Sequence, residues 1–463
     1  MRALLKDALR GVDGLVELRW HAKTARMVHV QKGRLESSTV RRRDGVAVRV
    51  LLDGTWGFAS TSDMSLRGIH RAMEDARAAA RATAGLRRDK VPDLPPAALA
   101  VGDFDQEGVA ELLARTMEER VGMVVDLEAR ARQASTQLAS TRAMYREIIE
   151  EKAIVTTDGA DAGFRLARPE LYVIATAERD GQLQTALESV GATGGWECLA
   201  ARQPQDMVDR AVRNAVDLLS ARPPEGGRAQ VVMAPSIVGL LVHEAIGHTV
   251  EADFVQAGSA AKGRLGEMVA SELVTLCDSG ASEHHAHAGG TIPVDDEGVL
   301  AGRTEIIRQG RLVGYLHNRE SAARMGMAPT GNARAWEYAD EPLIRMRNTY
   351  IEPGAQSVEE LIGGVRDGYL VEGPRNGQAD ATAEFTFGVA TARRIRDGKL
   401  GELVKGVTLT GNAFEVLRTV DGVSREFVWD LGGGHCGKGQ PMKVDAGGPY
   451  IRCRVMLGGE QAA

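Results

Sequence analysis

A histidine–glutamate pair followed by a second histidine is the part of the sequence best suited to metal chemistry. In the segment LLVHEAIGHTVEADF, His243 and Glu244 precede His248, which gives the pattern H-E-x-x-x-H. The familiar zinc pattern H-E-x-x-H places both histidines on one helix face and uses the glutamate as a base. Five residues on a regular helix instead turn the two side chains about 140° apart. The pattern therefore predicts a metal site only if the helix is widened by one residue or ends locally, and Gly247 could accommodate such a bulge.

Glu244 lies in the otherwise apolar segment SIVGLLVHEAIG. A carboxylate buried there would need a partner or a shifted pKa, which is typical of a catalytic base. The alternative interpretation is an ordinary core helix that carries these residues by chance. Two imidazoles are also too few, because a catalytic zinc usually has three protein ligands.

Other metal-binding side chains are close in sequence or lie further along the chain. Glu251 and Asp253 follow the motif, but they could simply be solvated or hydrogen-bonded. The segment EHHAH at 283–287 precedes two glycines and is predicted to be a solvated loop. Three cysteines lie in apolar surroundings and are predicted to be core thiols: Cys198, Cys277 and Cys453.

Cys436 differs from these three because it lies between glycines in WDLGGGHCGKGQ. A thiolate beside Lys438 and near a cation would have a lowered pKa, as a metal ligand requires. The same segment fits the phosphate-loop pattern G-x-x-x-x-G-K. However, Gly439 replaces the required Ser or Thr, and Pro441 opposes the helix that should follow. We therefore exclude a nucleotide-binding loop.

The elements that must position these residues follow from periodicity and turn signals. Helices are predicted over 3–10, 63–85, 106–135 and 205–220, with strands within 15–60 and 140–190. The segment ARPPEGG at 221–227 predicts a boundary between an N-terminal domain, 1–222, and a C-terminal domain, 223–463.

The second domain is predicted to open with the strand AQVVMAP and a helix over 236–250, followed by a glycine-rich region of short strands. No repeat of 20–50 residues supports a solenoid or propeller. We predict an α+β fold. Its N-terminal α/β domain has antiparallel strands and long helices, and its strand-dominated C-terminal domain carries the metal-site helix.

Composition narrows the function classes. The 463 residues include 43% hydrophobic and 26% charged residues, which is typical of a soluble globular protein. A net charge of −6 argues against nucleic-acid binding, and the absence of an apolar run of about 18 residues argues against membrane insertion. The four scattered cysteines favour a reducing compartment, so we expect a cytoplasmic location.

Several longer motifs carry a resemblance to a known family. They are HEAIGHTVEAD, GEMVASELVTLCD, IPVDDEG, GYLHNRESAARMGMAPTGNARAW, RMRNTYIEPG, VKGVTLTGNAFEVL and GHCGKGQ. Together they make the second half similar to the TldD/PmbA family of metallopeptidases, and in particular to the TldD-type subunit that carries H-E-x-x-x-H. In the first half the similarity rests on the order and length of the elements.

The resemblance implies that His243, His248 and Cys436 bind one divalent metal ion. A thiolate with two imidazoles suits zinc, and iron(II) could occupy the same ligands. It implies that Glu244 is the general acid/base that activates a metal-bound water. It also implies a dimer, with a PmbA-type paralogue or with itself, whose cavity admits unfolded peptides or modified-peptide precursors. His435 departs from the small apolar residue expected before the cysteine, and it could tune the site or face solvent.

Alternatives remain at this point. The chain could be a non-hydrolytic, chaperone-like subunit that binds peptides, or an amide hydrolase acting on small metabolites. The dipeptidyl peptidase III type also has H-E-x-x-G-H, but its later glutamate motif is not found after His248. Arg334, Tyr338 and His435 are candidates for stabilising an oxyanion.

Overall fold

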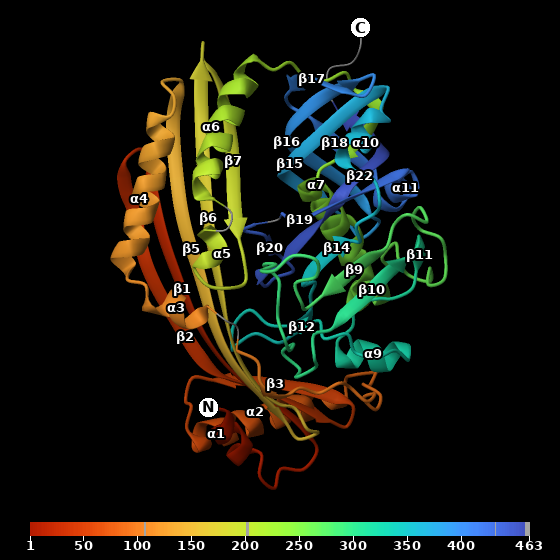
Figure 1. Ribbon diagram of the computed structural model, residues 1–463. Coiled ribbons are helices and arrows are strands. Elements are labelled where there is room, and N and C mark those ends of the chain that lie inside the picture. The colour runs from red at the N-terminus through yellow and green to blue at the C-terminus, as the bar shows by residue number, and fades with distance from the viewer. Residues whose placement is uncertain (106–107, 201–202, 431, 459–463) are drawn as a thin grey trace.

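The first half of the chain forms a long sheet of seven strands in a computed structural model that describes residues 1–105, 108–200, 203–430 and 432–458 (Figure 1). The strand order is β3-β2-β1-β5-β6-β4, with β7 also pairing with β6. The strands are β1 (Leu15–Gln31), β2 (Arg34–Leu52), β3 (Thr55–Thr61), β4 (Val101–Asp103), β5 (Leu138–Thr156), β6 (Asp161–Arg179) and β7 (Gln182–Gly191). Neighbouring strands are antiparallel except β4 and β6, which are parallel.

Helices cover one face of this sheet. They are α1 (Arg2–Ala8), α2 (Leu66–Ala84), α3 (Val109–Ala114), α4 (Met117–Gln133), α5 (Glu197–Ala200) and α6 (Pro204–Ser220). Alternate residues of β1 supply the apolar side of the sheet. Leu18 packs in a core with α2, whereas Val28 and Val30 pack in a core with α4 and α6.

The single helix predicted over 106–135 is two helices in the structure, so that prediction was wrong in this detail. Thr116 accepts a hydrogen bond from the backbone N–H of Glu119, and the Glu119 carboxylate accepts one from the N–H of Thr116. This capping box begins α4 and separates it from α3. Residues 106–107, where the predicted helix begins, lie outside the described residues.

The opposite face of the sheet is polar and buried. Glu17, Arg19, His21 and Lys23 alternate with the apolar residues of β1 and are at most 6% exposed. They are covered by segments of the second half of the chain. Arg19, for example, donates a hydrogen bond to the carbonyl oxygen of Asp340 at 2.7 Å.

The second half forms a sheet of eleven strands, in the order β11-β10-β9-β14-β22-β18-β16-β15-β8, with β17 on β16 and β19 on β22. The strands are β8 (Gly227–Met233), β9 (Leu276–Ser279), β10 (Arg303–Arg308), β11 (Arg311–Leu312), β14 (Asn348–Ile351), β15 (Asp367–Ala379), β16 (Glu384–Arg396), β17 (Lys399–Val404), β18 (Thr408–Asn412), β19 (Gly422–Trp429) and β22 (Asp445–Gly458). Because β22 also pairs with β8, the strands β22, β18, β16, β15 and β8 close into a ring.

Shorter elements complete this half. Two pairs of short strands stand apart from the large sheet: β12 (Ala333–Arg334) with β13 (Leu343–Ile344), and β20 (His435–Cys436) with β21 (Met442–Lys443). The α-helices are α7 (Pro235–Leu240), α8 (Ala252–Ala257), α9 (Arg319–Met325), α10 (Val358–Gly363) and α11 (Ala413–Arg418). The hydrophobic core joins α7 to the sheet through contacts such as those of Ile237 and Val238 with the cluster that contains Phe387.

The molecule is therefore a mixed, strand-rich α and β fold, which confirms the predicted fold class. We propose that the two sheets correspond to the domains 1–222 and 223–463. Among the residues that the structure describes, no helix is long and apolar enough to cross a membrane.

Candidate metal centre

The segment that carries both histidines is a widened helix. Helix α7 continues directly into a π-helix, η1 (Leu241–Gly247), and a turn of 3₁₀-helix, η2 (His248–Val250). A π-helix bonds residue i to residue i+5, so five residues complete about one turn. His243 and His248 consequently lie on the same side of the helix, which is widened as a metal site with this spacing requires.

Gly247 serves the widened helix in a different way from the one the sequence suggested. Its φ and ψ angles are −52° and −50°, which are ordinary helical values open to any residue. A Cβ atom at this position would lie 1.9 Å from the sulfur of Met346. The glycine is therefore needed for the close approach of Met346 rather than for unusual backbone freedom.

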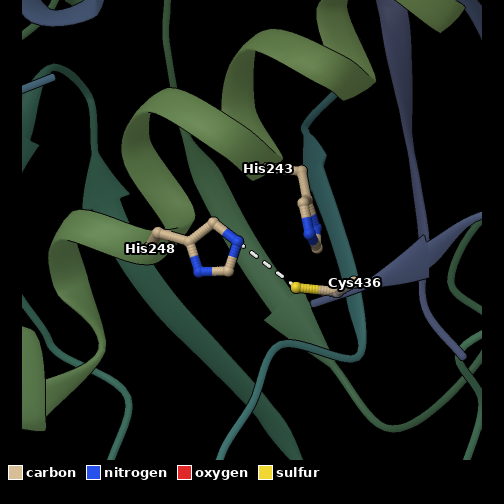
Figure 2. Close-up of side chains that lie close together, drawn as sticks. All are labelled: His243, His248 and Cys436. Carbon is tan, nitrogen blue, oxygen red and sulfur yellow. Dashed lines mark hydrogen bonds between the residues drawn. The ribbon is translucent and has the colours of Figure 1, made fainter. Parts of the chain in front are cut away.

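Cys436, on β20, meets the two histidines although it lies 188 residues after His248. Its Sγ atom is 3.2 Å from Nε2 of His248. One ligand atom from each of His243, His248 and Cys436 can be chosen so that all three lie within 4.8 Å of one another. Figure 2 shows the two rings and the thiol pointing toward a common space.

The burial of this group fits a bound cation. His243 is 1% exposed, and its two ring nitrogens make no hydrogen bond of regular geometry within the described residues. Leaving a buried imidazole without partners is costly, whereas a metal ion at the common point would supply one. Two imidazole nitrogens and a thiolate suit zinc and could also hold iron(II).

The charges around Cys436 favour its ionised form. Burial raises the pKa of the thiol, but the neighbouring His243 and His248 lower it by a larger amount, so that the pKa falls to about 5. In the reverse direction, burial lowers the pKa of His248, while its hydrogen bonds with Cys436 and Glu251 raise it to about 10. The thiolate is the form that binds metal. The sequence attributed this effect to Lys438, whereas the structure assigns it to the two histidines.

Glu244 lies beside the ligands at the edge of the solvent. Its side chain is 32% exposed, and Oε2 is 3.7 Å from Nε2 of His248. The apolar segment around it suggested a buried carboxylate. The structure instead leaves this carboxylate half-buried, where it can reach both the ligand group and a water molecule.

Glu251 stands behind His248. It is fully buried, and its Oε2 atom accepts a hydrogen bond from Nδ1 of His248 at 3.0 Å and one from Nζ of Lys438 at 3.1 Å. Burial raises the pKa of Glu251, but these two partners lower it below its ordinary value. A carboxylate on the second ring nitrogen orients a histidine so that the other nitrogen faces a metal. Of the two possibilities that the sequence left open for Glu251, hydrogen bonding is confirmed.

Arg345 is a residue of the site that the sequence did not indicate. Its guanidinium is buried and donates to the carbonyl oxygens of Cys436 at 2.7 Å and Gln440 at 2.6 Å. It thereby holds both ends of the loop that follows the cysteine. No spacing or motif links an arginine so far away in sequence to this loop.

The oxyanion candidates have other partners. Arg334 is buried and donates to the carbonyl oxygens of Met346 and Lys443. The ring of Tyr338 packs so closely on Gly45 of β2 that a Cβ there would lie 2.5 Å from it. Nδ1 of His435 is 3.0 Å from the carbonyl oxygen of Gly433. Burial lowers the pKa of His435 to about 4, and its side chain is only 16% exposed, so it does not face solvent.

The remaining expectations for side chains agree with the structure. His284, His285 and His287 are exposed in a loop, and Nε2 of His284 lies 2.8 Å from Oε2 of Glu352. Cys198, Cys277 and Cys453 are free and buried. Residues 435–436 and 442–443 form two short strands joined by a turn, with no helix between them, so the exclusion of a phosphate loop is supported.

Fold and site together define a mixed α and β protein in which a widened helix and the short strand β20 bring two histidines and a cysteine together. Family models described as PmbA/TldA metallopeptidase domain 1, central domain and C-terminal domain match residues 16–80, 111–219 and 226–459. The chain belongs to the PmbA/TldD family of metallopeptidases.

Curated relatives extend over nearly the whole chain. A metalloprotease of Methanothermobacter thermautotrophicus is 36% identical over 93% of this chain and 92% of its own length. A metalloprotease TldD homolog of Haemophilus influenzae is 30% identical over 90% of this chain and 86% of its own. A zinc metalloprotease TldD homolog of Saccharolobus solfataricus is 27% identical, covering 89% of both.

Solved structures share the fold. A Thermotoga maritima protein described as a putative modulator of a DNA gyrase has a TM-score of 0.80 at 21% identity and covers 99% of both chains. TldE from Thermococcus kodakarensis has a TM-score of 0.78 at 18% identity and likewise covers 99% of both chains. At these identities the likeness establishes the architecture alone.

Proposed function

We propose that this protein is a metal-dependent peptidase that hydrolyses unfolded or extended peptides. His243, His248 and Cys436 would hold one divalent ion, with zinc as the first choice and iron(II) as the alternative, and Glu244 would be the general acid/base. One observation carries the proposal: three ligand atoms from segments far apart in the sequence lie within 4.8 Å of one another beside a half-buried carboxylate. The names of the relatives support the same activity.

The side chains of the site have separate tasks in this proposal. When bound, a divalent ion at the cluster supplies a Lewis acid that polarises a carbonyl and acidifies a water. Glu244 takes the proton of that water and returns it to the leaving amine. Glu251 holds the ring of His248 through Nδ1, so that Nε2 faces the cluster.

Substrate and assembly belong to the same proposal. Binding through the peptide main chain, as an added strand, would explain cleavage with little side-chain preference, including cleavage of modified-peptide precursors. A dimer, with a PmbA-type paralogue or with a second copy, would enclose the substrate. The existence of a solved TldE with this fold supports the first form. Four free cysteines are in keeping with a reducing, cytoplasmic location.

The replacement Glu244→Gln tests the role of the carboxylate. Glutamine keeps the size of the side chain but cannot accept the proton, so zinc content should remain near one ion per chain while peptide hydrolysis falls by about 10²-fold or more. Elemental analysis and an assay with an unstructured peptide provide the two measurements. Retained turnover in a metal-loaded variant would contradict the role of Glu244.

The replacement Cys436→Ser tests the third ligand. A serine hydroxyl is a poor ligand for zinc, so the variant should lose most of its metal after dialysis, while Cys453→Ser should keep it. Assays of the wild type against peptides and against small amides separate the peptidase from an amide hydrolase. A metal-free wild type that binds peptides without cleaving them would favour the chaperone-like alternative.

A further inference from the structure

Lys438 occupies an unusual position next to the cysteine of the cluster. Its Nζ atom lies 3.1 Å from Oε2 of Glu251, 2.9 Å from Oδ1 of Asp253 and 3.0 Å from the carbonyl oxygen of Ile344. It also lies 4.4 Å from the centre of the Phe254 ring. The side chain is only 12% exposed. An ammonium with three acceptors and an aromatic face is firmly held, and it does not act as a free surface charge.

The backbone of Lys438 adopts a conformation that its side chain does not favour. Its φ angle is +72°, in the left-handed region that non-glycine residues rarely occupy. Its neighbours Gly437 and Gly439 are glycines, and Gly439 also has a positive φ, +78°. The chain therefore places a lysine, rather than a third glycine, at the centre of this turn. This placement directs the ammonium onto Glu251.

The turn joins the two sources of metal ligands. Arg345 fixes its ends through the carbonyl oxygens of Cys436 and Gln440. Lys438, in the middle of the turn, donates a hydrogen bond from Nζ to Oε2 of Glu251, and the same carboxylate bonds Nδ1 of His248. A continuous chain of hydrogen bonds thus runs from the loop of Cys436 to the ring of His248 without passing through a metal ion.

We propose that Lys438 is a positioning residue that holds Glu251 against His248 and so couples the cysteine loop to the histidine helix. Lys438 touches no reacting atom in this role, and the inference rests on the proposed metal site. Without the ammonium, the buried carboxylate of Glu251 loses one of its two donors and its fixed orientation, so the imidazole behind it is less well held. Metal affinity should therefore depend on a residue that does not bind the metal.

The test compares full-length Lys438→Met with Lys438→Arg, Glu251→Gln and the double variant. Methionine keeps an unbranched side chain and must adopt the same left-handed backbone conformation as lysine. A difference in zinc affinity from wild type therefore reports on the loss of the ammonium group. Arginine retains a cation. Lys262→Met, which removes an exposed lysine whose Nζ atom donates to the carbonyl oxygen of Gln256, controls for the loss of one positive charge.

Zinc affinity is measured by competition with a chromophoric chelator, and the geometry of the site by the absorption spectrum of the cobalt(II)-substituted protein. We expect Lys438→Met to weaken zinc binding about 10-fold to 100-fold and to change the cobalt spectrum. Lys438→Arg should recover part of the affinity, and Lys262→Met should match wild type. In the Glu251→Gln background, Lys438→Met should have little further effect, because a neutral amide no longer needs the ammonium.

Affinity and spectrum unchanged in Lys438→Met would overturn the proposal, as would losses that simply multiply in the double variant. If Lys438→Met does not fold by circular dichroism, Lys438→Arg decides: zinc affinity near that of wild type supports the role of a cation, and a complete loss of binding overturns it. Failure of the proposed function gives a different result. In that case wild type would bind no zinc that depends on Cys436, or Glu244→Gln would still cleave peptides.

Discussion

The thiol of Cys436 and the imidazoles of His243 and His248 show how a group of side chains acquires properties that none has alone. Burial by itself would keep the thiol protonated, yet its pKa falls to about 5 beside the two rings. The cost of burying these groups is offset by their mutual contacts, by the bond of Glu251 to His248 and, when one is bound, by a cation. Binding of a cation at this site should therefore add to the free energy of unfolding of the whole protein.

Metal removal should reduce stability for this reason. An ion that binds only the folded state at 100 times its dissociation constant adds about 2.7 kcal/mol to the free energy of unfolding. Differential scanning calorimetry with and without a chelator should show a lower unfolding temperature for the chelated wild type. Cys436→Ser should respond much less to the chelator. An unfolding temperature of the wild type that chelation does not change would contradict this expectation.

The sequence indicated the roles of some residues of the site but not of others. The spacing of His243 and His248 indicated that a metal site would require a widened or locally ended helix, but the role suggested for Gly247 differs from the one in the structure. Cys436 was singled out by its glycine-rich surroundings, but its placement in a ligand set came from the resemblance to a family. The bond of Lys438 to Glu251 and the bonds of Arg345 could not be read from the sequence, because each joins segments more than 90 residues apart.

At the scale of elements, the π-helix η1 is the feature that makes the histidine spacing usable. Its regular α-helical alternative would turn His243 and His248 to different faces. Packing against Met346, which is fully buried, fixes the position of the widened turn, and Gly247 provides the space.

Gly247→Ala should therefore disturb both the helix and the site. The added methyl group would overlap the sulfur of Met346, and overpacking of this kind costs about 1–3 kcal/mol. Zinc affinity should fall as well, because the turn that carries His248 must shift. Urea unfolding and chelator competition measure the two effects.

Gly122→Ala is the matched control for this prediction. Gly122 lies in helix α4, and nothing lies within 4 Å of the position that its Cβ would take. Alanine there should be neutral or stabilising by up to about 1 kcal/mol. Equal effects at the two positions would show that packing on Met346 is not the constraint.

The break between α3 and α4 was encoded by a local capping signal in the sequence. The apolar periodicity of 106–135 favoured one long helix, but Thr116 and Glu119 form the sequence pattern of a capping box. A cap inside a periodic segment begins a new helix, and this information was present in the sequence.

At the scale of the whole molecule, charged side chains connect the first sheet to loops of the second half of the chain. Asp296, from the second half, accepts hydrogen bonds from Nζ of Lys152 on β5 at 2.7 and 3.0 Å. Burial raises the pKa of Asp296, but Lys152 and Arg19 lower it to about 2, against an ordinary value of 3.8. The carboxylate is thus ionised in the folded protein at a pH where it would be protonated in the unfolded chain.

This depressed pKa predicts a specific loss of stability in acid. The stabilisation, about 2 kcal/mol, is fully present above the unfolded pKa of 3.8 and disappears as the pH falls through about 2. The difference in free energy of unfolding between wild type and Asp296→Asn should shrink by roughly 1 kcal/mol between about pH 5 and about pH 3. Urea unfolding followed by tryptophan fluorescence measures it.

Asp126→Asn, at an exposed position of α4, serves as the comparison and should follow the wild-type pH profile. A difference between wild type and Asp296→Asn that stays constant from pH 5 to pH 3 would contradict the role of Asp296 between the sheets.

The amino-acid sequence by itself determined the features that depend on neighbouring residues. Alternating apolar residues and turn signals predicted strands within 15–60 and 140–190, where β1, β2, β3, β5 and β6 lie. Helices were predicted where α2 and α6 lie, and the histidine spacing required a widened or locally ended helix for a metal site. The tertiary structure alone decided which distant groups meet: the sulfur of Cys436 with the ring of His248, Lys438 with Glu251, and the polar face of β1 with the second half of the chain. Local patterns reflect the fixed geometry of helices and strands, whereas these contacts depend on how segments far apart in the sequence pack together, and no short segment encodes that arrangement.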